Sequence, residues 1–197
     1  MINLNDSSYD AGTSAVIFNG GKAGIVNNVT ISIEKKKADD KEQAPDYKLV
    51  FTDANGGSCN TSFWYVTADT QYANMKEQTL KQGKILKHII HAIYGSEFQI
   101  PVVKTPKELL DTCMKLIRDG LASGLKFRVF ANYGTAQYTK KYIQPRSWVP
   151  FMEPMTVLEE ESRLKQGDLD AMVRLEEDSP VSVSEKSSSS TDDDDWD

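Results

Sequence analysis

Alternating apolar and polar residues in the first third of the chain predict three β-strands. The segment 23–37 contains a run in which every second side chain is apolar, as in a strand with one buried face. Residues 46–53 and 61–67 are rich in aromatic and β-branched residues, which favour strands. Asn55-Gly56-Gly57 between them favours a tight turn. We therefore expect the second and third strands to pair as an antiparallel hairpin.

The middle of the chain changes to helical spacing. Apolar residues in the segment 74–94 recur three and four positions apart, and Gly95 is a suitable residue to end that helix. A second helix is expected after Thr105, which can cap it, with Pro106 in its first position and Glu108 completing a capping-box pattern.

Strand patterns return after the helices and complete a recognisable order. Residues 125–133 alternate again, and residues 138–143 with the segment 146–151 supply a last strand and its exit. Three strands, two helices and two strands predict a mainly β protein with inserted helices, specifically a five-stranded OB-fold barrel with the helices between strands three and four.

The chain is expected to divide into three parts. Residues 1–152 would form the OB-fold domain, and residues 153–175 a linker or short helix, drawn from the segment 155–174. Residues 176–197 are rich in Ser and Asp with few apolar side chains, so we expect a disordered acidic C-terminal tail.

The net charge of −6 conceals two parts of opposite sign. Residues 1–152 hold 19 Lys or Arg against 14 Asp or Glu, a net charge of +5. Residues 153–197 hold 4 against 15, a net charge of −11. A basic body joined to an acidic end is typical of a protein with an interaction tail, and a basic body is compatible with a polyanionic ligand.

Several classes of protein are disfavoured by the sequence. No apolar run approaches the length of about 18 residues that a membrane helix needs, and the polar residues 1–9 do not resemble a secretory signal. With only Cys59 and Cys113, we expect no disulfide framework and a reducing compartment, the cytoplasm.

Catalytic and metal-binding signatures are not found either. There is no phosphate-binding loop, no GxSxG or HExxH motif and no clustered pair of carboxylates in the body, so we expect neither an enzyme nor a cofactor. His88 and His91 share a helix face and could bind metal with a cysteine, but structural zinc sites use closer ligand pairs. We interpret both histidines as surface or packing residues.

Aromatic and basic residues on the expected strands predict a surface for single-stranded nucleic acid. Exposed rings stack on bases, and cations neutralise phosphates. On residues 125–133, Phe127 and Val129 would face the core, leaving Lys126, Arg128 and Phe130 on the opposite, binding face. The ordinary alternative is that the rings are core and the lysines merely solvated. The candidate residues are Lys48, Phe63, Trp64, Tyr65, Lys126, Arg128, Phe130, Tyr133, Lys140, Lys141, Tyr142, Arg146 and Trp148.

The tail carries a second candidate motif. It ends with Asp192, Asp193, Asp194, Asp195, Trp196 and Asp197. A lone aromatic residue among carboxylates suits an apolar pocket rimmed by basic groups on a partner protein. The tail would also compete with DNA for the basic groove of the body. The alternative is a tail that only improves solubility.

The strand–helix–strand order and the tail resemble those of the single-stranded-DNA-binding proteins of tailed bacteriophages. The resemblance implies an OB-fold that binds and protects single-stranded DNA, without marked sequence preference, during phage replication, recombination or repair in the host cytoplasm. It also implies that the tail recruits replication proteins and gates the groove. The family tail usually ends on its aromatic residue, whereas Asp197 follows Trp196 here.

Two other functions remain open at this stage. One is a recombination protein that anneals complementary strands. The other is a protein-interaction adaptor that acts through its acidic tail. The sequence also leaves the oligomeric state open, a homodimer included.

Overall fold

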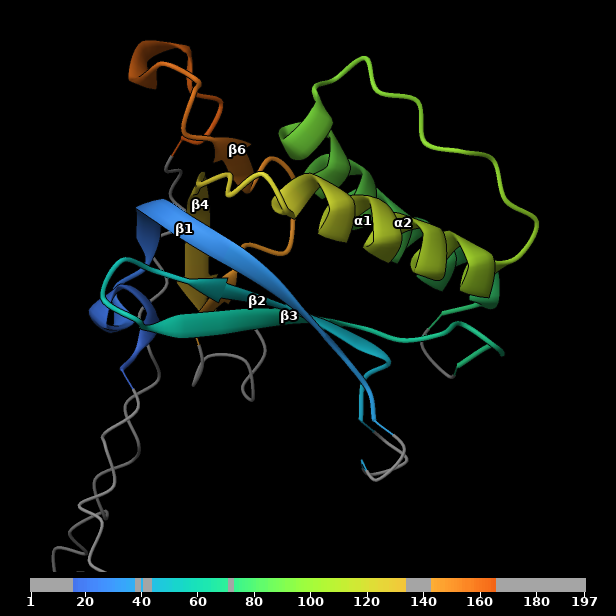
Figure 1. Ribbon diagram of the computed structural model, residues 1–197. Helices are drawn as coiled ribbons and strands as arrows, with labels where there is room; N and C mark the ends of the chain where they lie inside the picture. The colour runs from blue at the N-terminus through green and yellow to red at the C-terminus, as the bar shows by residue number, and fades with distance from the viewer. Residues whose placement is uncertain (1–15, 38–39, 41–43, 71–72, 134–142, 166–197) are drawn as a thin grey trace, which may run out of the picture.

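A computed structural model describes residues 16–37, 40, 44–70, 73–133 and 143–165 of the chain (Figure 1). It is mainly antiparallel β-sheet with two helices inserted between the third and fourth strands, as expected. Two 3-10 turns flank these elements, η1 (Phe18–Gly21) and η3 (Glu159–Glu161). The elements are β1 (Gly24–Lys35), β2 (Tyr47–Thr52), β3 (Ser58–Phe63), α1 (Met75–Tyr94), α2 (Pro106–Leu121), β4 (Phe127–Tyr133), β5 (Ile143–Pro145) and β6 (Met152–Pro154).

The long strand β1 joins two parts of the sheet. Its first half pairs with β4, and its second half, from Thr30 to Lys35, pairs with β2. The register shifts between Val26 and Val29, where Asn28 has a φ of 59°, a conformation that Asn tolerates better than most residues. This irregularity lets β1 lie across both β2 and β4 (Figure 1).

The hairpin of β2 and β3 forms as expected, but its second strand is shifted. β3 covers residues 58–63 rather than 61–67. Beyond Phe63 the backbone leaves the ladder because side chains replace strand partners: Trp64 N–H donates to Gln82 and Tyr65 N–H donates to Asp46. The turn is held by Asp53, whose carboxylate accepts from Asn55, Gly57 and Asn19 N–H groups.

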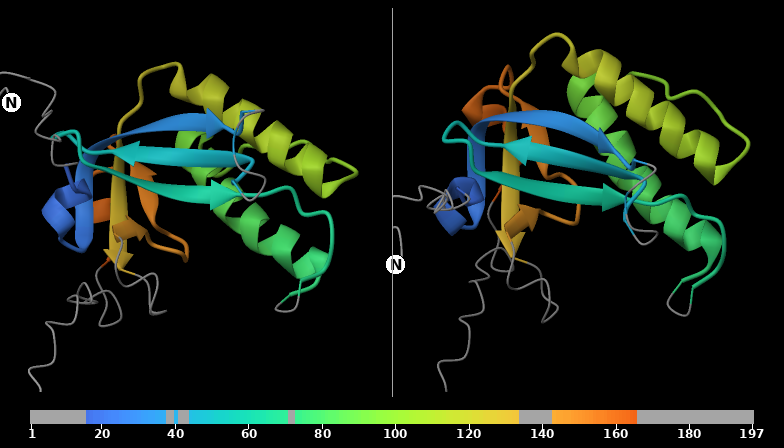
Figure 2. Two further views of the ribbon diagram at one scale, coloured as in Figure 1. Left: turned by 90° about the horizontal axis from the view of Figure 1, so that it is seen from below. Right: turned by 60° about the horizontal axis from the view of Figure 1, so that its bottom comes forward.

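The core lies between the inner face of this sheet and the two helices. Strand alternation places Val29, Ile31, Leu49 and Phe51 on the inner face. Their partners from the helices are Leu86, Ile89, Ile90, Leu110, Met114 and Ile117, all buried. In both views of Figure 2 the helices lie beside each other on one side of the β1–β3 layer. Neither helix therefore covers the opposite face of the layer.

Both helices begin where the sequence predicts. Asn74 caps α1 in a reciprocal capping box with Glu77, and Gly95 follows its last residue. Thr105 caps α2 by accepting from Glu108 N–H. The Glu108 carboxylate, however, accepts from Lys104 N–H, one residue before the cap, so the box at α2 is only half formed.

Two tyrosines fasten α2 to the sheet. The hydroxyls of Tyr47 and Tyr65 donate to the same oxygen of Asp111, at 2.6 and 2.7 Å. Desolvation raises the pKa of Asp111, but these two hydrogen bonds, together with the positive charges of Lys35 and Lys107, outweigh it and hold that pKa below its ordinary value. The ionised carboxylate therefore links β2 and the segment after β3 to the helix.

β5 and β6 pair with successive parts of β4. β5 is opposite residues 131–133 and β6 is opposite residues 127–129. Phe130 lies between them and bonds to both, accepting from Arg146 N–H and donating to Phe151 C=O. The two strands thus act as one partner of β4, interrupted by an excursion of residues 147–150. The sequence predicts the last strand and its exit over residues 138–143 and 146–151. Residues 138–142 lie outside the described part, β5 begins at Ile143, and no strand lies between residues 146 and 151.

The expectation that one face of β4 is exposed is wrong. Every residue of β4 is buried, because the chain after β5 returns over its outer face. Arg128 forms an ion pair with Glu153 at 2.6 Å, and the Arg146 guanidinium lies 4.4 Å from the centre of the Phe130 ring.

The folded body also continues past residue 152, where the domain was expected to end. Leu164 is buried and Arg163 N–H donates to Glu153. Over residues 155–165 the expected helix is reduced to η3; residues 166–197 lie outside the described part.

The strand order is β3-β2-β1-β4-β5, with β6 beside β4. Within the described residues no ladder joins β3 to β5, so a hydrogen-bonded closed barrel is not formed there. Neither α1 nor α2 combines the length and the apolar character needed to cross a bilayer.

The buried ion pair gives a stability prediction. Arg128→Met should lower the free energy of unfolding by about 3–5 kcal/mol, because Glu153 would remain buried without its partner. The double variant Arg128→Met/Glu153→Leu should recover most of that loss, because no unpaired charge remains. Urea unfolding followed by tryptophan fluorescence measures both. Lys126→Met, an exposed neighbour, is the control; equal losses in the single and double variants would contradict the prediction.

Candidate functional site

Within the described part of the chain, the outer face of the β1–β3 layer is polar and is not covered by a helix. It presents mostly small hydroxyl and amide side chains, together with Lys48 and Val50 on β2 and Glu34 opposite Lys48 on β1. The small polar residues are Thr30, Ser32, Thr52, Ser58, Asn60 and Ser62. Such a face has room for a planar or extended ligand and carries few bulky groups to exclude it.

A basic groove, here called the hairpin groove, lies at the end of this face where β1 turns toward β2. It has a volume of about 550 Å³. Its charged lining comprises Lys35, Lys36, Lys37 and Lys48 against Glu34 and Asp40. The excess of cations makes the groove suitable for an anionic chain.

A second groove, here called the β3–β5 groove, fills the gap between the two ends of the strand path. Its volume is about 260 Å³. One wall is formed by residues 60–62 of β3 and the other by residues 144–147, with Ile85 and Phe151 also lining it. The groove thus combines amide and hydroxyl groups on its walls with apolar side chains.

The two grooves meet on the sheet. Lys48 lines the hairpin groove, Ser62 lines the β3–β5 groove, and these two residues are direct cross-strand partners. A continuous path therefore runs from the lysines of the hairpin, across β2 and β3, to the loop after β5. Two exposed tryptophans lie close in sequence to residues of this path, Trp64 after Ser62 and Trp148 after Ser147.

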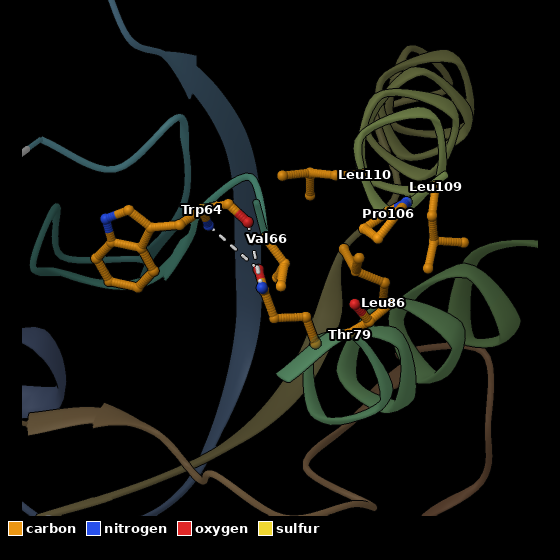
Figure 3. A pocket seen from close by; sticks show the side chains of 8 residues that line it. Trp64, Val66, Thr79, Leu86, Pro106, Leu109 and Leu110 are labelled. Carbon is orange, nitrogen blue, oxygen red and sulfur yellow. Dashed lines mark hydrogen bonds between the residues drawn. The ribbon is translucent and has the colours of Figure 1, made fainter. Parts of the chain in front are cut away.

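Trp64 directly follows the last residue of β3. Its side chain is 49% exposed, and it follows Ser62 by two residues, diagonally across from Lys48. The Gln82 side chain bonds both the N–H and the C=O of Trp64, at 3.2 Å each, and so holds its backbone in place. Figure 3 shows the indole pointing away from the small apolar cavity behind it, which at about 10 Å³ has no room for a ligand.

Trp148 is presented by the excursion between β5 and β6. It is 40% exposed, and the Arg146 guanidinium lies 5.3 Å from its ring centre. Arg146 itself is buried between Phe130 and Trp148 and donates to the carbonyls of Lys165 and Pro150. Its role in the described structure is to fix this loop and the orientation of the exposed ring.

One face of α1 holds both walls of the β3–β5 groove. Gln82 bonds Trp64 at the end of β3, Ile85 lines the groove, and His88 reaches the loop on the other side. His88 Nε2 accepts from the N–H groups of Phe151 and Met152, at 3.1 Å each. These three residues are spaced three apart and therefore lie along one side of the helix.

The remaining sequence candidates do not all reach this path. Phe63, Phe130 and Tyr133 are buried, and Arg128 is occupied by Glu153, so none of these side chains is on the surface. Tyr65 is bound to Asp111, and Lys126 is exposed at the start of β4, beside Met155. Lys140, Lys141, Tyr142 and the tail residues 192–197 lie outside the described part.

Other residues of the path were not chosen from the sequence. Lys35, Lys36 and Lys37 were visible as a basic run next to a strand, and that charge was the available signal. Asn60 and Gln144 offered no signal, because polar residues on a strand are expected on any solvent-facing side.

Metal or thiol chemistry finds little support in the described residues. They contain no group of three or more ligating side chains. His88 uses Nε2 as an acceptor for backbone N–H groups. Cys59 and Cys113 are free and buried, and burial raises the pKa of the Cys113 thiol to about 11, which makes it unreactive at neutral pH.

Comparison of the chain with protein-family models, curated proteins and solved structures finds no match. The chemistry of the two grooves and of the two exposed tryptophans near them is therefore the basis for a function.

His88 gives a pH prediction for the wall of the β3–β5 groove. Burial lowers the pKa of His88 to about 4 from 6.5, and the positive charges of Arg163, His91 and Arg146 act in the same direction. The folded protein therefore holds His88 neutral, and its contribution is lost as pH falls from 6.5 towards 4, where only the unfolded chain takes up the proton. The loss should reach at most roughly 3 kcal/mol.

The comparison variant is His88→Gln, whose amide keeps an acceptor but does not titrate. Urea unfolding at pH 7 and at pH 4.5 should show a smaller pH-dependent loss in this variant than in the wild type. The same loss in both proteins would mean that His88 does not carry the effect.

Proposed function

We propose that this protein binds single-stranded DNA along the path from the hairpin groove to the β3–β5 groove, and that it is not an enzyme. The observation that carries the proposal is the cross-strand pair Lys48–Ser62, which joins a basic groove to a polar groove; two exposed tryptophans, Trp64 and Trp148, follow residues of the polar groove. Lysines that neutralise phosphates and rings that stack on bases are the two elements that single-strand binding requires.

The two kinds of contact have separate roles. The hairpin lysines attract any polyanion and release counterions when they bind phosphates, which makes affinity depend on salt. Trp64 and Trp148 favour a strand whose bases are unpaired, because a base in a duplex is already stacked on its neighbours. Base stacking on an aromatic side chain is worth about 1–3 kcal/mol per base.

The strand order supports an OB-fold as the finer description of the architecture. The path β3-β2-β1-β4-β5, with β3 and β5 lining one groove, is compatible with the partly open five-stranded barrel of that fold. β6 would then belong to the fifth strand, which the excursion at 147–150 interrupts. OB-folds bind oligonucleotides on strands two and three and the adjoining loops, which here are β2, β3 and the hairpin groove.

The acidic tail completes the proposal. Its aromatic residue among carboxylates would dock into a basic, apolar pocket of a replication or recombination protein. The same carboxylates would compete with DNA for Lys35, Lys36, Lys37 and Lys48. The protein would thus coat and protect single strands and recruit partners to them.

Stacking predicts the effect of removing Trp64. Trp64→Ala should weaken binding of fluorescently labelled oligo-dT about 5- to 150-fold, as expected for the loss of one stacked base, and Trp64→Phe should recover part of it. Fluorescence polarisation measures the affinity. Leu158→Ala changes an equally exposed apolar residue outside the two grooves and serves as the control. Unchanged affinity in Trp64→Ala would remove Trp64 from the binding surface.

Phosphate contact predicts a change in salt dependence. Lys48→Met should reduce the slope of log affinity against log salt by about 0.7, as expected for one lost contact with a single strand. Titrations of oligo-dT at several salt concentrations give the slope, and Lys115→Met, on the exposed side of α2, is the control. Wild-type binding that is insensitive to salt would argue against the whole phosphate path.

Truncation separates the competing functions. A chain ending at Glu176 should bind oligo-dT at least as tightly as the full chain, because it lacks the competing carboxylates. An adaptor would bind no DNA in either form. A protein that specialises in annealing would accelerate the pairing of complementary strands, which a stopped-flow assay with labelled oligonucleotides would detect.

A further inference from the structure

The β3–β5 groove has the chemistry of a base-binding pocket rather than of a phosphate channel. Its walls present Asn60 and Ser62 on one side and Gln144 and Ser147 on the other. Ile85 adds an apolar surface on which a planar ring can lie. At about 260 Å³ the groove is smaller than the 300–1,000 Å³ typical of drug-sized ligand sites, which suits one planar base.

Among the described residues, the one cation that lines this groove is Arg146, and it is already engaged. Arg146 is buried between two aromatic rings, and its guanidinium donates to the carbonyls of Lys165 and Pro150. An arginine free to form two parallel hydrogen bonds would favour guanine. Arg146 instead supports the wall, so the amides are left to contact a base.

The two amides are available for recognition. Within the described part of the chain, no hydrogen bond is formed by the side chain of Asn60 or of Gln144. Each amide offers a donor and an acceptor side by side, which matches the N7 acceptor and N6 donor of adenine. The edges of unpaired bases are free for such contacts in a single strand.

We propose that the β3–β5 groove takes up one unpaired adenine of the bound strand, recognised by Asn60 and Gln144. This inference depends on the proposed function and refines it: the tryptophans and lysines bind any strand, and the groove adds a preference at one position. Trp148, next to Ser147 on the rim, would stack on the neighbouring base. A strand containing adenine should therefore bind more tightly than one containing only thymine.

The test compares oligo-dT with oligonucleotides of the same length that carry one central adenine, guanine, cytosine or abasic site, using the full-length protein. Fluorescence polarisation should show tighter binding for the adenine strand, by about 5- to 150-fold if the amide contact is fully formed. Asn60→Asp, which keeps the shape and loses the donor, and Gln144→Ala should each abolish this gain, measured as the ratio of the affinity for the adenine strand to the affinity of the same variant for oligo-dT. The ratio is used because the negative charge added by Asn60→Asp weakens binding of every strand alike. Gln99→Ala, an exposed amide in the loop between the helices, should keep the gain.

The outcomes distinguish this inference from the proposed function. Binding of all strands with equal affinity would overturn the adenine pocket and leave single-strand binding intact. A preference for guanine or cytosine would overturn the assignment to adenine. A gain that persists in both Asn60→Asp and Gln144→Ala would place adenine recognition elsewhere. Failure to bind any strand would overturn the proposed function itself.

Discussion

The ion pair between Arg128 and Glu153 holds the chain that follows β5 against the outer face of β4, and the candidate surface depends on that return. Two charges in a buried position stabilise a fold only when each has its partner, and Arg128 also bonds Asn27 in β1 while Glu153 accepts from Arg163 N–H. With β6 anchored in this way, residues 147–150 must leave the sheet. That excursion places Trp148 at the rim of the β3–β5 groove.

Local signals in the sequence predicted most of the fold. Asn74 and Thr105 sit where each helix begins, because caps and apolar spacing act within a few residues. The burial of both faces of β4 was not predictable in this way. Arg128 and Phe130 look solvent-facing from alternation, and only the return of Glu153 and Arg146 from about twenty residues later along the chain buries them.

The candidate surface also contains residues that the sequence predicted and residues that it did not. Trp64 and Trp148 are exposed, and Lys48 is half-buried on its strand. Phe63, Phe130 and Tyr133 were chosen as stacking rings and are core. Asn60 and Gln144 were overlooked because their significance comes from facing each other across a groove that only the strand order creates.

The row of Gln82, Ile85 and His88 on α1 has a mechanical consequence. One rigid helix bonds to the β3 side of the groove through Gln82 and to the loop side through His88, so the separation of the two walls is set by about 9 Å of helix axis. A ligand that entered the groove would meet walls that are already positioned. Little conformational entropy would then be lost on binding. A shift of α1 would move both walls of the groove together.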